Sequence, residues 1–161
     1  TQMLKAPRED VSGRVGDLVQ QVRDLEKKVR DLAARSRKTR IPGLVNLVKR
    51  GPVSSVVSIV TDVNDADELR SMGSDVLAAL GKEANVVALG AEIGGRATIV
   101  ITANAPAVGR GINSGQLVKE ASSILGGKGG GKATLAQGGG PDGSRLGSAL
   151  EGVSRALGEI E

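Results

Sequence analysis

The 161-residue sequence contains no cysteine, no histidine and no aromatic residue. Without cysteine the chain can form neither a disulfide nor a thiolate metal site, which fits a reducing compartment. Without histidine as well, it lacks the commonest zinc ligands, general bases and activated nucleophiles, so carboxylates, lysines and hydroxyls are all that remain for chemistry. We therefore expect no catalytic residue and no metal site in this chain.

The absence of Phe, Trp and Tyr restricts any core to Val, Leu, Ile and Ala, although 39% of the residues are hydrophobic. Such a core must depend on many small contacts. No apolar run approaches the roughly 20 residues of a membrane span, and no signal-peptide pattern opens the sequence. Because the chain starts with "TQML" and not with an initiator methionine, we expect a fragment of a longer protein.

Charge is distributed unevenly along the sequence. Residues 1–51 hold 13 Lys and Arg against 6 Asp and Glu, a net charge of +7, whereas the remaining residues hold 9 against 12, a net charge of −3. A positive segment attached to a mildly acidic domain can attract and bind nucleic acid electrostatically. Solvated helix faces explain the same distribution about equally well.

A heptad pattern predicts one long helix over about residues 9–37, roughly 40 Å in length. Its seam has too few heptads to identify the partner, which can be a second copy, another chain or a helix outside this sequence. A basic cluster near its end suits the helix dipole and is also a candidate RNA contact. The seam comprises Val11, Val15, Leu18, Val22, Leu25, Val29 and Leu32, and the basic cluster comprises Arg35, Arg37, Lys38 and Arg40.

The pattern changes after this helix and predicts a separate globular domain. We divide the chain into a helical arm (1–42), a linker (43–52) and an α/β domain (53–161). The expected order in the domain is strand, helix, strand, strand, helix, loop and helix, which describes a small mixed sheet packed with helices. The strands are expected at 53–60, 85–92 and 96–103, with a hairpin turn at "IGG", and the helices at 65–81, 114–125 and 142–161.

The stretch "GGKGGGKATLAQGGG", residues 126–140, is expected to be a loop without secondary structure. Gly126, Gly131 and Lys132 have the spacing of a phosphate-binding P-loop, but Ala133 stands where that motif needs a hydroxyl, and a helical segment precedes it where a strand is required. The aliphatic residues and the Gln in its middle favour a loop anchored at its centre, mobile at its flanks, with a packed and amide-rich surface.

This stretch resembles the glycine-rich signature of the DHHA1 domain, in the version found at the C-terminal end of bacterial alanyl-tRNA synthetases. The resemblance covers nearly the whole chain, since "MLKAP" followed by a heptad helix is similar to the segment after the editing domain of those enzymes. The order of strands and helices from residue 53 onward is also similar.

The resemblance implies a non-catalytic domain that binds the outer corner, or elbow, of tRNA(Ala) and links aminoacylation to editing. It also implies a cytoplasmic parent ligase that uses ATP, Mg and Zn at sites outside this chain, so no cofactor is expected here. The helical part, or the globular domain, can support a homodimer.

Because the sequence has no aromatic ring on which splayed bases could stack, we expect recognition of the shape and backbone of folded RNA. The glycines are expected to allow close approach, the lysines to bind phosphates, and the glutamine either to make a polar contact or to anchor the loop. The candidate tRNA-binding residues are Gly127, Lys128, Gly129, Gly130, Gly131, Lys132, Gln137, Gly138 and Gly139.

Two other functions fit the same sequence. In one, the heptad helix makes the chain a coiled-coil oligomerisation module. In the other, the chain is the nucleic-acid-binding domain of a DHH-type phosphoesterase, because DHHA1 domains also accompany those enzymes.

Overall fold

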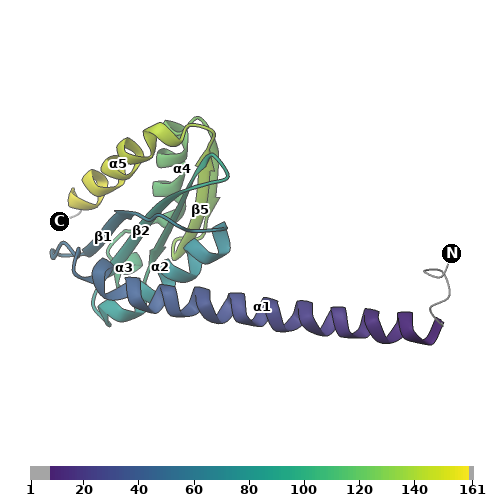
Figure 1. Cartoon of the computed structure of the whole chain (residues 1–161). Helices are drawn as coiled ribbons and strands as arrows, with labels where there is room; N and C mark the ends of the chain where they lie inside the picture. The colour runs from purple at the N-terminus through teal and green to yellow at the C-terminus, as the bar shows by residue number, and fades with distance from the viewer. Residues whose placement is uncertain (1–7, 160–161) are drawn as a thin grey trace. The chain divides into compact units, whose positions relative to one another are not determined.

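The computed structural model describes residues 8–159, so the "MLKAP" segment of the sequence lies outside the described residues. The chain divides into two compact units, Thr1–Thr39 and Arg40–Glu161. A single helix, α1 (Arg8–Val45), forms the described part of the first unit and continues into the second (Figure 1). None of the helices within residues 8–159 has the length and apolar character needed to cross a bilayer.

The α1 helix extends eight residues beyond the end that the sequence predicted, and includes Pro42. The buried side chain of Leu44 explains this extension, because it fixes the last turn in a core of the second unit. The chain leaves the helix through a turn in which the Asn46 N–H donates to Pro42 O at 3.1 Å.

The second unit contains a five-stranded mixed sheet with the order β1-β2-β3-β5-β4. The β1 strand is parallel to β2, and all other neighbouring strands are antiparallel. This confirms the predicted fold class. The elements are β1 (Ser54–Ile59), α2 (Ala66–Leu80), β2 (Asn85–Ile93), β3 (Arg96–Ala103), α3 (Ala105–Gly109), α4 (Ser114–Ile124), β4 (Lys128–Gly131), β5 (Leu135–Gly140), the 3-10 helix η2 (Gly143–Arg145) and α5 (Leu146–Gly158).

Two aliphatic cores lie on opposite sides of this sheet. On one side, residues of α3, α4 and α5 pack against alternate residues of β2 and β3, such as Val86 and Ile99. On the other side, α2 and the end of α1 pack against the intervening residues, such as Val87 and Val100. The α2 helix, which the sequence predicted at 65–81, begins at an Asp65 cap, whose carboxylate accepts the Glu68 N–H at 2.7 Å.

The hairpin between β2 and β3 is confirmed: Ile93 pairs with Arg96 across a turn of Gly94 and Gly95, which have φ values of 59° and 78°. A two-residue turn with positive φ at both positions matches the twist of antiparallel strands and suits glycine.

The expectation of a loop without secondary structure at residues 126–140 was wrong. The β4 and β5 strands form an antiparallel hairpin there, in which Lys128 pairs with Gly139 and Gly131 with Ala136. The β5 strand also pairs with β3, so the hairpin forms one edge of the sheet. The predicted flanks of the loop are therefore ordered strands, and its centre, residues 132–134, is the turn. The short helix α3 was likewise not predicted.

Candidate nucleic-acid interface

One side of the β4–β5 hairpin is packed against α4. A Cβ at Gly129 would lie 2.5 Å from Val118 Cγ1 and 2.6 Å from Ser122 Oγ, and a Cβ at the paired residue Gly138 would meet the same two side chains. Both distances are shorter than real Cβ contacts, so the helix can approach this closely because the hairpin has no side chain there. These two glycines are thus explained by packing within the chain.

Several other glycines of the stretch lie against backbone. A Cβ at Gly131 would lie 2.6 Å from the Ala136 Cα, and one at Gly140 would lie 2.6 Å from the Leu125 carbonyl carbon. Gly127 and Gly139 would meet the backbone of Gly139 and Ala97, respectively. Gly130 differs, because no described atom lies within 4 Å of a Cβ at that position.

The opposite side of the hairpin is open. Side chains alternate between the two sides of a strand, so Lys128 and Gly130 of β4 and Gln137 of β5 face away from α4. The α2 helix covers the neighbouring β2 and β3 strands on this side, and Leu135 at the start of β5 packs against the same core, whereas Lys128, Gly130 and Gln137 do not belong to it. A hollow of about 400 Å³ results, which we call the hairpin basin; its lining residues are Ala66, Ile93, Arg96, Ala97, Thr98, Lys128, Gln137, Gly138 and Gly139.

The charged side chains that line the hairpin basin are both cationic, namely Lys128 and Arg96. Both are exposed, and neither forms a salt bridge within the described residues. The Gln137 side chain is exposed too, and it makes no hydrogen bond with any residue in the range 8–159. The amide therefore does not anchor the hairpin in this structure, and it can donate and accept hydrogen bonds to a ligand.

The structure brings together four of the predicted residues, Lys128, Gln137, Gly138 and Gly139, in the lining of the hairpin basin. Lys132 is exposed at the hairpin turn, where its N–H donates to Leu135 O at 2.8 Å, and it does not line the basin. The remaining glycines lie in or next to β4, with Gly127 and Gly129 packed as described above.

The predicted basic cluster of the arm is divided between the two units. Arg35, Arg37 and Lys38 lie on α1 within the first unit. Arg40 belongs to the second unit, where its guanidinium donates to Thr61 O at 2.7 Å and lies 3.4 Å from the Asp62 carboxylate. Arg40 thus has a structural role at the turn between β1 and α2.

Arg96 and Thr98 were missed by the sequence analysis, although both line the hairpin basin. They lie on β3, some thirty residues before the glycine-rich stretch, and reach the basin because β3 pairs with β5. The sequence signal that could have found them is the β4–β5 hairpin. If residues 126–140 had been interpreted as two strands, alternation along β3 would have placed Arg96 and Thr98 on the same side of the sheet.

Another cationic side chain near the hairpin has a partner. Arg145 Nε lies 3.1 Å from the Asp142 carboxylate, just after β5. The Ser144 hydroxyl donates to this carboxylate and, with the charge of Arg145, holds the pKa of Asp142 below its usual value. Asp142 therefore stays ionised at neutral pH and offsets the charge of Arg145.

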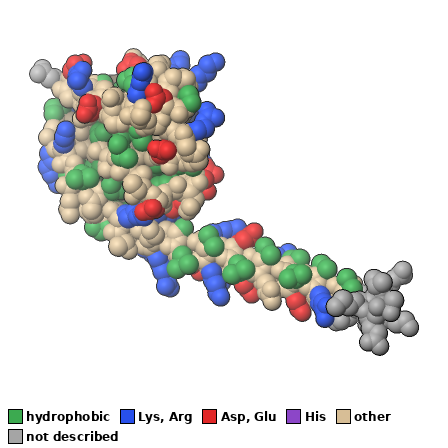
Figure 2. Space-filling view, turned by 45° about the horizontal axis from the view of Figure 1, so that its top comes forward, with side chains coloured by type: hydrophobic (Ala, Val, Ile, Leu, Met, Phe, Trp, Pro, Cys, Tyr) green, Lys and Arg blue, Asp and Glu red, His purple; other side chains and the backbone are tan. Residues whose placement is uncertain are grey.

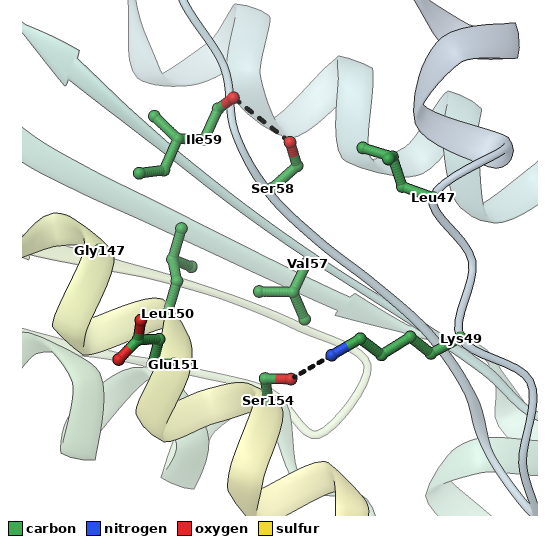
Figure 3. Close-up of a pocket in the computed structure, with 9 residues that line it drawn as sticks. All are labelled: Leu47, Lys49, Val57, Ser58, Ile59, Gly147, Leu150, Glu151 and Ser154. Atoms are coloured by element: carbon green, nitrogen blue, oxygen red, sulfur yellow. Dashed lines mark hydrogen bonds between the residues drawn. The ribbon is translucent and has the colours of Figure 1, made fainter.

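A second hollow, of about 320 Å³, lies between β1 and α5 (Figure 3). Val57, Ile59 and Leu150 make it largely apolar, and the Lys49 ammonium donates to Ser154 Oγ at 3.5 Å. Glu151 adds a negative charge at its wall. An apolar lining with a carboxylate is poorly suited to a phosphate backbone, so the hairpin basin is the better candidate for a nucleic-acid interface.

No group of three or more His, Cys, Asp or Glu side chains gathers as a metal site among residues 8–159. The arrangement at the hairpin instead offers cations, a free amide and backbone with little side-chain cover.

The globular part of the chain matches a known family of domains. Residues 53–159 match the profile of the DHHA1 domain, so the chain belongs to the DHHA1 domain family, as its glycine-rich stretch predicted. The chain is also similar to alanine–tRNA ligases; one from Leifsonia xyli subsp. xyli is 38% identical over 156 residues, which are 96% of this chain and 18% of that ligase. The chain spans less than one fifth of the length of the curated alanine–tRNA ligases that it matches.

Two solved structures share the fold. The C-Ala domain from Aquifex aeolicus alanyl-tRNA synthetase superposes with a TM-score of 0.58 and 24% identity, covering 70% of this chain and 96% of that domain. A DHH-domain protein described as a member of the s1p family of ribosomal proteins superposes with a TM-score of 0.51 and 12% identity, covering 89% of this chain and 35% of that protein. At these identities, the likeness concerns the fold alone.

The packing of α4 against the hairpin predicts different effects of alanine at two neighbouring glycines. Gly129→Ala should lower the free energy of unfolding by about 1–3 kcal/mol, because its methyl group overpacks the contact with Val118 and Ser122. Gly130→Ala should leave it unchanged or raise it by up to about 1 kcal/mol, because its methyl group enters open space. Urea unfolding of both variants measures the difference; equal stabilities would contradict this account of the packing.

Proposed function

We propose that the chain is a non-catalytic tRNA-binding domain of an alanine–tRNA ligase, and that it binds tRNA(Ala) through the open side of the β4–β5 hairpin. The family and the relatives support the parent enzyme. The observation that carries the proposed surface is the hairpin basin, in which Lys128, Arg96 and the free Gln137 amide line a hollow on the sheet beside the start of α2. Cations that bind phosphates, beside polar groups that can contact ribose or bases, form the usual composition of an RNA-binding surface.

The target that suits this surface is a structured part of the tRNA, and we propose the elbow. Single-stranded RNA is usually read by stacking its bases on aromatic side chains, which this sequence lacks. A rigid sheet edge is better matched to a preformed RNA surface, and the elbow is the folded outer corner of the tRNA. Binding there would link aminoacylation and editing by holding one tRNA against both activities of the parent enzyme.

The chemistry of the parent enzyme belongs outside this chain under the same proposal. The parent would be a cytoplasmic ligase that uses ATP and Mg for charging and Zn for editing. The absence of His and Cys from the sequence agrees with an editing zinc site located elsewhere, since those residues are the usual zinc ligands.

The phosphoesterase alternative is less well supported. The shared fold does not separate the two functions, because a DHH-domain protein also superposes on this chain. The sequence relatives do favour the ligase, since several curated alanine–tRNA ligases match over 93–98% of this chain.

Self-association is a second candidate function, favoured by the exposed seam of α1. The seven seam residues predicted from the heptads are 52–64% exposed, from Val11 at 52% to Leu32 at 64%. Figure 2 shows hydrophobic side chains along the length of this helix. An apolar stripe of this length is typical of a coiled-coil partner surface, and a second copy of the chain would cover it.

Replacing both hairpin lysines tests the proposed tRNA interface. Lys128→Ala combined with Lys132→Ala should weaken tRNA binding and lower the slope of log affinity against log salt by about one for each lost phosphate contact. Fluorescent tRNA titrated at several salt concentrations measures both, with an elbow-disrupted tRNA as the comparison.

A matched variant separates local contacts from net charge. Lys82→Ala with Lys119→Ala removes the same charge from the segment just after α2 and from α4, both outside the hairpin basin. This control should lose little affinity; an equal loss in the two double variants would point to non-specific attraction and reject the interface.

A charge in the seam tests self-association. Leu25→Glu should weaken a dimer by about tenfold or more, because the side chain of Leu25 is 60% exposed on the helix and would be buried in each partner. Light scattering over a range of concentrations measures the mass. Lys27→Gln changes the charge by the same amount outside the seam and should leave the mass unchanged; a wild-type chain that stays monomeric would dismiss this function.

A further inference from the structure

The free amide of Gln137 has a defined position relative to the two cations of the hairpin basin. Thr98, Gly139 and Lys128 form one row across β3, β5 and β4, and Gln137 with Gly130 belongs to the next row. Gln137 and Lys128 are therefore diagonal neighbours on adjacent strands, with Cα atoms about 7–8 Å apart. The Gln137 amide thus lies close enough to Lys128 for both to contact the same nucleotide.

Arg96 lies at the other end of this arrangement. It is two residues before Thr98 on β3, which is two strands away from β4, so its Cα is about 12 Å from that of Lys128. Both side chains are long and exposed, and neither forms a salt bridge with a described residue. Two cations at this separation, on the same side of a sheet, can bind two different phosphates while the region between them contacts sugar.

The region between the two cations has few side-chain atoms that project from the sheet. It consists of the backbone of Gly138 and Gly139 and the short side chain of Thr98, which all line the hairpin basin. No aromatic ring is available there for stacking, since the sequence has none. A surface of this kind cannot hold a splayed base by stacking, but it can approach a continuous ribose and phosphate surface.

We propose that the hairpin basin binds the shallow minor groove of an A-form RNA helix, with Arg96 and Lys128 on phosphates and the Gln137 amide on a ribose 2′-hydroxyl. This inference rests on the proposed tRNA-binding function but not on the elbow: it places the hairpin basin on a helical stem of the tRNA next to the folded corner, and it names a residue that distinguishes RNA from DNA. The minor groove of A-form RNA is wide and displays 2′-hydroxyls, whereas its major groove is too deep and narrow for side chains to read. An amide can donate to and accept from a hydroxyl, so Gln137 suits this contact in either direction.

The test compares a short RNA duplex with the same duplex carrying 2′-fluoro groups, which keep the A-form but remove the donating hydroxyl. The wild-type chain should bind the RNA duplex more tightly than the 2′-fluoro duplex. Gln137→Met retains the length of the side chain and removes its amide, so it should lower affinity for the RNA duplex about 2–10-fold and leave that for the 2′-fluoro duplex unchanged. Gln137→Ala should give the same pattern and guards against a folding defect in either variant.

Arg96→Ala provides a different signature. It should weaken binding to both duplexes equally and lower the salt slope by about one, because a phosphate contact does not depend on the 2′ group. Arg110→Ala removes the same charge at the end of α3, outside the hairpin basin, and should leave both affinities close to wild type.

Binding of intact tRNA, measured in the same titrations, separates a failure of the minor-groove inference from a failure of the proposed tRNA-binding function. If tRNA binds but the wild-type chain does not distinguish the two duplexes, or if Gln137→Met weakens both equally, the minor-groove inference is wrong and the tRNA-binding function stands. If neither tRNA nor duplex binds, the proposed function fails, and the inference fails with it.

Discussion

The close approach of α4 to the β4–β5 hairpin is the contact on which the candidate site depends. A helix usually packs on a sheet through side chains from both elements, but here Val118 and Ser122 meet backbone, because Gly129 and Gly138 have no side chain. The helix therefore fixes the hairpin from one side. Since strand residues alternate, the same contact directs Lys128 and Gln137 to the other side.

The composition of the core imposes a related constraint on the whole second unit. Without aromatic rings, burial is shared among many aliphatic side chains in two layers, with Leu69, Met72, Leu89, Ile99 and Ile101 among the largest that are fully buried. Each contributes about 1.5–3 kcal/mol at most, so stability depends on close packing across the whole sheet. Gly90 also allows a close contact between a helix and the sheet, because a Cβ there would lie 2.8 Å from Leu146 Cδ1 of α5.

Much of this architecture could be predicted from the sequence, because its signals are local. The heptads predicted α1, the helical pattern of residues 65–81 predicted α2, and the Gly94–Gly95 turn predicted the β2–β3 hairpin. The β4–β5 hairpin could not be predicted in this way, since "KGGG" has almost no strand propensity and becomes a strand through its pairing with β5 and its contact with α4. The extension of α1 past Pro42 was missed for the same reason, because the burial of Leu44 is a tertiary contact.

The candidate site shows the same division between local and tertiary information. Lys128, Gln137 and the glycines were found because they are adjacent in sequence, whereas Arg96 joins them through the pairing of β3 with β5. The glycines were expected to allow close approach of RNA, but for most of them the group that lies close in this structure is α4 or neighbouring backbone. The glycines of this stretch therefore serve mainly to let α4 and neighbouring backbone pack closely against the hairpin. The surface on the other side consists mostly of backbone, and a few long polar side chains extend from it. Under the proposed function, such a surface would recognise RNA through the spacing of those side chains, which the sheet register fixes.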